Sequence, residues 1–185
     1  YSDKSENQTM EIENQYPIGK LELQDFSIAV KDSALGDIRF LPNALEAAIT
    51  NLDEAQLHTP YREGGWTIHQ LVHHVADSHI NAYTRFKLCL TEDLPTIKPY
   101  DENLWTQLED VKSLPVNIST TLLYALHMRW YEAIKDLKDD DWQRAAYHPE
   151  MKKELSLWYF LQSYAWHGKH HVAQINRLRE KMKWG

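Results

Sequence analysis

Apolar residues recur at steps of three and four positions along four stretches of the chain, and this spacing places them on one face of an α-helix. The pattern predicts four amphipathic helices, over residues 33–52, 68–91, 117–137 and 157–181. Thr67 and Ser156 are suitable N-caps for the second and fourth of these helices. Pro42 lies inside the first, and we expect it to kink this helix or to mark a late start.

The segments between these helices carry turn signals instead of a helical period. Residues 59–66, TPYREGGW, predict a loop with two glycines. Residues 92–116 contain three prolines and predict a long connection with at most one short helix around residues 102–109. A connection of this length is typical of a crossover or of a segment that covers a site. Residues 139–154 predict a bridge with a small hairpin. The predicted fold is all-α, a four-helix bundle with a long crossover.

Composition narrows the classes of function. With 43% hydrophobic and 25% charged residues, the chain resembles an ordinary soluble globular protein. We expect residues 15–185 to form a single domain and the polar residues 1–14 to be a flexible segment. A net charge of −7 argues against nucleic-acid binding, and no apolar run is long enough to span a membrane. The lone cysteine, Cys89, cannot form an internal disulfide, so a cytoplasmic location is expected.

Histidines are concentrated in the fourth predicted helix, in the stretch SYAWHGKHHVAQI. His167 and His171 are four positions apart, the spacing by which one helix offers two imidazoles to one ion. At 100° per residue, His171 falls about 40° and His167 about 80° from the middle of the apolar stripe. His170 falls about 140° away, so we expect it to face solvent.

The second predicted helix adds histidines in the stretch HQLVHHVADSH. His69 and His73 are also four apart, but they lie far from the apolar stripe and are expected on a solvated face. His79 lies near the centre of the apolar face and His74 on its flank. Periodicity alone therefore ranks His79 above His74 as a third ligand.

Several kinds of metal site can be set aside. A ferritin-like di-iron bundle needs Glu-x-x-His on two helices, and the zincin motif is His-Glu-x-x-His; the chain contains neither. A single ion held by three histidines remains. The alternative is that these are ordinary, partly buried histidines with satisfied hydrogen bonds. Cys89 is expected to be a core residue and not a nucleophile.

Two stretches resemble a known family. GGWTIHQLVHHVADSHINAYTRFKLCLTE and WHGKHHVAQINRLR are similar to the DinB-like superfamily, and within it to the YfiT-type metal-dependent hydrolases and bacillithiol transferases. PYREGGWT and YHPE fit the same subfamily, and the similarity extends from residue 16 onward. The resemblance implies a bundle with up-down-down-up connectivity and one divalent ion, zinc or nickel. The implied ligands are His74, His167 and His171, with His79 in reserve.

Four residues near these ligands are candidates for orienting a ligand or meeting a substrate: Asp77, His79, Tyr83 and Arg85. Asp77 could equally be a solvent-facing helix charge. For Tyr83 and Arg85, a structural role is the simpler interpretation.

The resemblance implies a metal-dependent enzyme that activates either water, as a hydrolase, or a small thiol, as an S-transferase. The expected partner is a small molecule, with no nucleic acid and no membrane, and a homodimer is expected. The alternative is a stress-related bundle that binds a small ligand without turnover and holds a structural metal. A structural zinc usually has four protein ligands, so a fourth side chain at the ion, His127 or His79, would favour that alternative.

Overall fold

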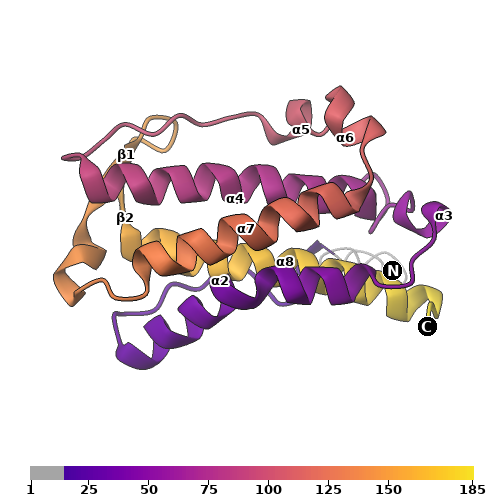
Figure 1. Cartoon of the computed structure of the whole chain (residues 1–185), viewed down its shortest axis with the longest axis horizontal. Helices are drawn as coiled ribbons and strands as arrows, with labels where there is room; N and C mark the ends of the chain where they lie inside the picture. The colour runs from indigo at the N-terminus through magenta and orange to yellow at the C-terminus, as the bar shows by residue number, and fades with distance from the viewer. Residues whose placement is uncertain (1–14) are drawn as a thin grey trace, which may run out of the picture.

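Four long helices lie side by side in the computed structural model, which describes residues 15–185 (Figure 1). They are α2 (Ile28–Ile49), α4 (Ile68–Thr91), α7 (Val116–Ile134) and α8 (Leu157–Met182). α2 and α8 run in one direction and α4 and α7 in the other, so the up-down-down-up bundle is confirmed. The flexible segment predicted for residues 1–14 lies outside the described residues.

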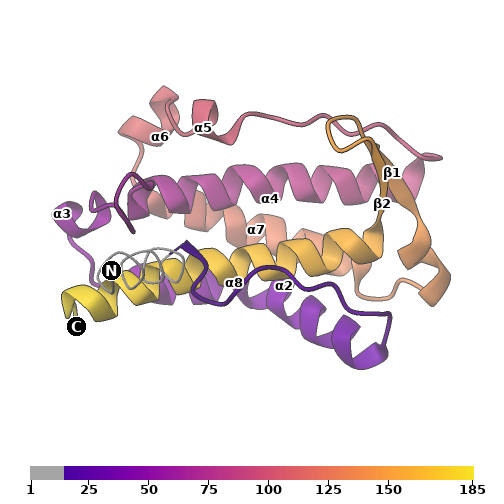
Figure 2. The same ribbon diagram turned by 180° about the vertical axis from the view of Figure 1, so that it is seen from behind.

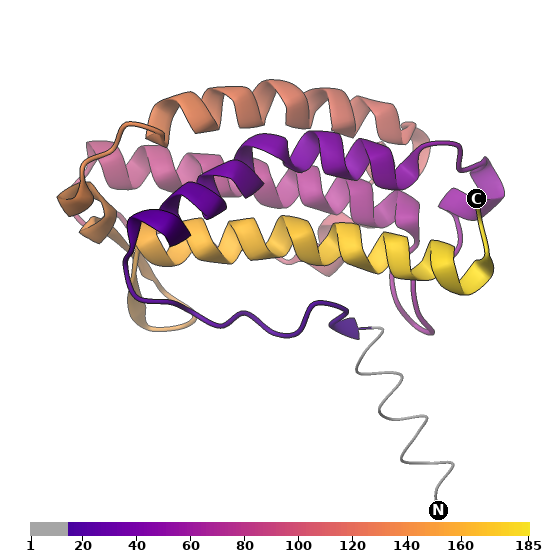
Figure 3. The same cartoon turned by 90° about the horizontal axis from the view of Figure 1, so that it is seen from below.

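Side-chain caps explain where α2, α4 and α8 begin. Thr67 forms a capping box with Gln70 at the start of α4, and Ser156 accepts a hydrogen bond from the backbone of Tyr159 at the start of α8. α2 begins at Ile28, earlier than the predicted residue 33, because Ser27 caps it. α2 continues through Pro42, and Figure 3 shows the bend along this helix. The expected kink is therefore correct and the late start is wrong.

A long crossover joins α4 to α7, since two consecutive parallel helices require the chain to return along their whole length. Residues 92–115 make this return outside α4 (Figure 1). The crossover contains two short helices, α5 (Glu102–Trp105) and α6 (Glu109–Ser113), where at most one was expected. Asp101 caps the first of them, and a proline follows the second, so local capping divides the predicted element in two.

Both ends of the crossover are fastened to the rest of the chain. Near its start, the backbone N–H of Tyr147 donates to the carbonyl of Pro95 at 2.9 Å, and the N–H of Ile97 donates to the carbonyl of Tyr147 at 3.1 Å. At its end, the carbonyl of Leu114 accepts hydrogen bonds from the Nε2 atoms of His69 and His73, both at 3.0 Å. The crossover is thus a strap held at two points.

Short elements complete the chain. α3 (Glu54–Leu57) lies between α2 and α4, and a 3₁₀ helix, η1 (Asp139–Gln143), follows α7. The predicted hairpin is confirmed as two antiparallel strands, β1 (Ala145–His148) and β2 (Lys153–Ser156). Residues 15–27 run across α8 on the way to α2 (Figure 2). Within residues 15–185, no helix is long and apolar enough to cross a membrane.

The apolar interior divides into two clusters, one toward each end of the bundle. One contains Phe86, Trp130 and Leu161, and the other contains Leu45, Val72 and Ile175, among others. Between them lies a band of imidazoles that we call the histidine layer: His74, His79, His127, His167 and His171. Two apolar clusters therefore enclose a polar layer on both sides.

Candidate metal centre

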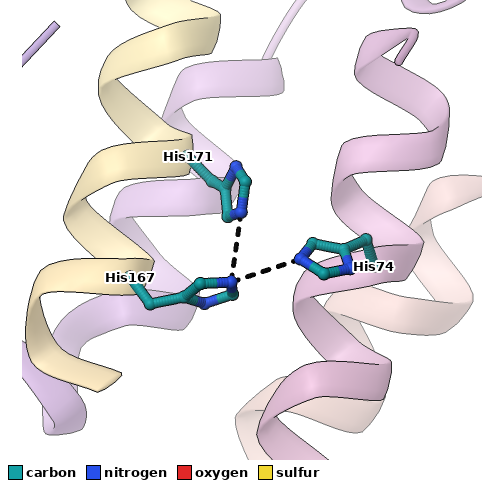
Figure 4. A group of neighbouring side chains, drawn as sticks. All are labelled: His74, His167 and His171. Carbon is teal, nitrogen blue, oxygen red and sulfur yellow. Dashed lines mark hydrogen bonds between the residues drawn. The ribbon is translucent and has the colours of Figure 1, made fainter. Parts of the chain in front are cut away.

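Three histidine side chains meet inside the bundle, and we refer to them as the histidine triad: His74 of α4 and His167 and His171 of α8 (Figure 4). The Nε2 atom of His167 lies 3.2 Å from Nε2 of His74 and 3.1 Å from Nε2 of His171. One nitrogen from each residue lies within 4.8 Å of the other two. The structure therefore brings together the three residues that the resemblance implied as ligands.

Helix geometry and close packing explain this convergence. His167 and His171 occupy one face of α8 because they are one turn apart. Between them is Gly168, where an added Cβ would lie only 2.7 Å from Cδ1 of Leu41 in α2. Trp66, in the loop before α4, places its ring 4.5 Å from that of His74. The lack of a side chain at Gly168 and the ring of Trp66 beside His74 thus contribute to the positions of the three imidazoles.

Gln174 determines which nitrogen of His171 carries a proton. Its amide nitrogen donates to the carbonyl of Gln15 at 2.9 Å, and it lies 3.0 Å from Nε2 of His170. This orientation leaves Oε1 facing Nδ1 of His171 at 2.8 Å. Because the amide oxygen can only accept, Nδ1 of His171 carries the hydrogen and its Nε2 presents a lone pair to the triad.

Burial keeps the triad neutral. Desolvation lowers the pKa of His74 to about 2, and lowers the pKa values of His167 and His171 well below 6.5. Neighbouring imidazoles lower them further, since a second positive charge in the cluster would be repelled. Neutral imidazoles are the form that binds metal ions.

The donor set fits a divalent ion. Three imidazole nitrogens each roughly 2.0–2.1 Å from an ion in tetrahedral geometry are roughly 3.3 Å apart. The two spacings of 3.1 and 3.2 Å are close to this value. Imidazole binds zinc, nickel, iron and copper, so the donors indicate a divalent metal without selecting one.

His79 and His127 lie behind the triad and do not complete it. Nε2 of His79 lies 3.0 Å from Nδ1 of His167, on the side of that ring away from the triad, and Nδ1 of His79 lies 2.9 Å from Nε2 of His127. Both nitrogens of His79 are therefore already engaged. Among residues 15–185, the cluster of metal-ligand type consists of the triad alone.

A pocket of about 250 Å³ reaches the triad at His171. Its lining is mostly polar or aromatic: Gln15, Tyr16, Tyr61, Arg62, Gly64, Gly65, Trp66, Glu102, Asn103, His170, His171 and Gln174. Glu102, on α5 of the crossover, has Oε2 4.0 Å from Nε2 of His74. Its side chain is 54% exposed, and partial desolvation raises its pKa above the ordinary value. A carboxylate thus lies near one nitrogen of the triad, Nε2 of His74.

The other predicted site residues lie outside this pocket. Asp77 faces the crossover, and desolvation together with the charge of Asp110 raises its pKa to about 6. Arg85 donates to the hydroxyl of Tyr164 at 2.5 Å. The ring of Tyr83 packs against one apolar cluster and lies under two cations. These contacts agree with the structural interpretation of Tyr83 and Arg85.

Three histidines expected at the surface are buried, and this part of the prediction is wrong. His69 and His73 are 6% and 5% exposed because the end of the crossover covers them. His170 is 7% exposed, with its ring between those of Trp166 and Tyr16. The segments that cover these histidines are irregular, and a helical wheel describes only the helix itself and not the loops that pack on it.

Sequence reasoning missed two residues of the site, Glu102 and Gln174. Gln174 follows His171 by three positions, one helical turn, and this spacing is a signal that could have been used. Glu102 had no such signal, because the apolar residues of the crossover that carries it do not recur at a helical spacing.

Known proteins resemble this chain over most of its length. A sequence profile of the DinB superfamily matches residues 38–175. Proteins of Bacillus mycoides (strain KBAB4) and Bacillus cereus (strain B4264), each named “Putative metal-dependent hydrolase”, are 47% identical over 170 residues, or 91% of this chain and 97% of each relative. A solved structure, described as “YfiT from Bacillus subtilis is a probable metal-dependent hydrolase with an unusual four-helix bundle topology”, has a TM-score of 0.90 at 42% identity and covers 94% of this chain and 99% of its own.

Proposed function

The chain belongs to the DinB superfamily, and from this premise we propose that it is a hydrolase that depends on one divalent metal ion bound by the histidine triad. The names of its relatives support metal-dependent hydrolysis as the class of reaction. The ligands are His74, His167 and His171, each through Nε2.

The observation that carries the proposal is that the triad offers three ligands and not four, and that a pocket reaches it at His171. Structural zinc sites usually close with four protein ligands, whereas catalytic sites keep a position for water or substrate. The two histidines that could have supplied a fourth ligand, His79 and His127, are bonded to each other behind the triad. This arrangement favours an enzyme over a bundle with a structural metal.

The residues around the triad have distinct parts in such a reaction. A bound divalent ion supplies a Lewis acid that lowers the pKa of water and polarises a carbonyl or phosphoryl oxygen. Glu102 is placed to accept the proton that the attacking water loses and to return it to the leaving group. Its raised pKa makes it a better proton acceptor than an ordinary glutamate. Trp66 covers one side of His74 and lines the pocket.

The pocket favours a small polar substrate. Arg62, Asn103 and Tyr16 provide hydrogen-bonding groups around a volume of about 250 Å³, which suits a molecule of a few tens of atoms at most. Transfer of a small thiol would use the same position on the ion, the one that the three histidines leave free. Activity assays separate this reaction from hydrolysis.

Metal content by elemental analysis tests the site. We expect close to one equivalent of a divalent metal in the wild type after purification or after reconstitution with zinc or nickel, and loss of that metal in His171→Ala. His69→Ala is the matched control, because His69 is a buried histidine of α4 outside the triad. Absence of metal from the reconstituted wild type, or equal loss in both variants, contradicts the proposal.

Turnover by the metal-loaded protein tests the reaction. Chromogenic esters and amides report hydrolysis, and monochlorobimane with cysteine or bacillithiol reports thiol transfer. We expect hydrolysis that requires the metal and is absent from His171→Ala. Thiol transfer without hydrolysis would replace the proposed reaction while leaving the metal site intact.

A further inference from the structure

A row of hydrogen bonds leads away from the triad and crosses all four long helices. Nδ1 of His167, on α8, lies 3.0 Å from Nε2 of His79 on α4. Nδ1 of His79 lies 2.9 Å from Nε2 of His127 on α7. Nδ1 of His127 lies 2.5 Å from the carbonyl oxygen of Ile38 on α2. His79 and His127 are 0% and 1% exposed, so water does not compete for these bonds.

The carbonyl at the end of the row fixes the direction of every bond. A neutral imidazole has one N–H donor and one acceptor nitrogen, whereas a carbonyl can only accept. His127 must therefore donate from Nδ1 to Ile38, which leaves its Nε2 as an acceptor for Nδ1–H of His79. Nε2 of His79 is in turn an acceptor for Nδ1–H of His167. By this sequence of donors, the lone pair of His167 lies on Nε2 and faces the triad.

Pro42 explains why the carbonyl of Ile38 is free to accept. In an α-helix, the N–H of each residue donates to the carbonyl four residues earlier. Pro42 is four residues after Ile38 and has no N–H, so the carbonyl of Ile38 lacks its usual helical partner. The imidazole of His127 supplies the missing donor.

We propose that His79 and His127 are positioning residues of the metal centre. They connect His167 to the carbonyl of Ile38, which Pro42 leaves free, and thereby hold His167 as the Nδ1–H tautomer. The proposal rests on the proposed function, because it takes His167 as a metal ligand. The second nitrogen of a metal-binding histidine is usually fixed by a carboxylate, a carbonyl or water. Here two further imidazoles connect the ligand to the carbonyl.

His73 provides an internal comparison. It is also a buried histidine of α4, and it also has two hydrogen-bond partners, the hydroxyl of Ser119 at 2.7 Å and the carbonyl of Leu114. Its bonds lead to the end of the crossover and to α7, and not to the triad. A loss of stability is thus expected on replacing either His73 or His79, whereas a loss of metal affinity is expected only for His79.

The experiment combines zinc affinity with nitrogen-15 NMR of the histidine side chains. In wild-type protein without metal, we expect His167, His79 and His127 each to carry the proton on Nδ1. His79→Leu removes both bonds, and we expect zinc affinity, measured by chelator competition, to fall by roughly 10- to 100-fold. His79→Gln can accept from His167 through its amide oxygen and donate to His127 through its nitrogen, so its affinity should stay within about threefold of wild type. His73→Leu should bind zinc like wild type.

Several outcomes would overturn the proposal. Protonation of His167 on Nε2 in the metal-free wild type would show that the row has the opposite direction. Wild-type zinc affinity in His79→Leu, or an equal loss in His73→Leu, would reduce His79 to a structural residue. If His79→Leu does not fold, the wild-type spectra and His79→Gln decide. If the wild type binds no metal, the proposed function fails, and the tautomers of the metal-free protein still test the row by itself.

Discussion

Oε1 of Gln174 lies 2.8 Å from Nδ1 of His171, one helical turn away on α8. The side chain of a neutral residue thus sets the protonation of a triad member without adding a charge to the site. Its amide nitrogen is held by the backbone of Gln15, so the N-terminal part of the described chain contributes to the orientation of the ligand.

Replacing Gln174 by leucine should weaken zinc binding about tenfold, because His171 loses the acceptor that holds its tautomer. Gln162→Leu is the matched control: Gln162 is a buried glutamine of the same helix whose side chain bonds to Gln24 and not to the triad. Chelator competition measures both affinities. Equal affinities in the two variants would remove Gln174 from the metal centre.

Glu102→Gln should lower kcat for hydrolysis by about 100-fold or more at unchanged metal content, since an amide cannot accept and return a proton. Glu109→Gln, an exposed glutamate of α6 in the same crossover, should retain wild-type turnover. Steady-state kinetics on the metal-loaded proteins, with elemental analysis of each, provide the measurement. Full activity in Glu102→Gln would assign proton transfer to another group.

The metal-free protein should lose stability as the pH falls below 6.5. Burial lowers the pKa of His127 to about 4, whereas in the unfolded chain its imidazole titrates near 6.5. Between these values the unfolded chain binds a proton that the folded chain does not. The free energy of unfolding therefore decreases as the pH is lowered from 6.5 to 4, by about 3 kcal/mol from His127 alone. Urea denaturation at several pH values should give a shallower pH dependence for His127→Gln, and an unchanged dependence would be inconsistent with this account.

Gly168→Ala should destabilise the protein by roughly 1–3 kcal/mol, because the new Cβ would meet the buried side chain of Leu41 at 2.7 Å. Gly36→Ala is the matched control within α2: a Cβ there has no neighbour within 4 Å among the described residues, so helix propensity should stabilise it by up to about 1 kcal/mol. Thermal or urea unfolding of both variants gives the comparison. Equal effects would mean that α8 can move away from α2 without cost.

The sequence predicted the bundle well because each long helix has one apolar stripe, and because α4 and α8 also have a clear start signal. Thr67 and Ser156 are the caps that the pattern indicated. The start of α2 was less accurate because its first turns, after Ser27, include few core residues. The two parts of the crossover helix could not be separated, since helices of four and five residues are shorter than two periods.

The site was predictable only where two kinds of signal coincided. The spacing of His167 and His171 indicated one face, and the motif indicated His74, although periodicity alone ranked His79 higher. The structure shows why periodicity was ambiguous: His79 lies in the same histidine layer, and its ring contacts His167 instead of completing the triad. A wheel describes one face of one helix, whereas this layer is built from three.

The strap fastened at Tyr147 and at Leu114 has an evolutionary consequence. The histidine triad is supplied by α4 and α8 alone, while Glu102 reaches the pocket from the crossover. Substitutions at the exposed positions between the two fastenings can therefore accumulate in descendants without disturbing the scaffold, whereas Thr106 and Val111, each 2% exposed, pack against it. Chemical preference can diverge there while the histidine triad is inherited unchanged.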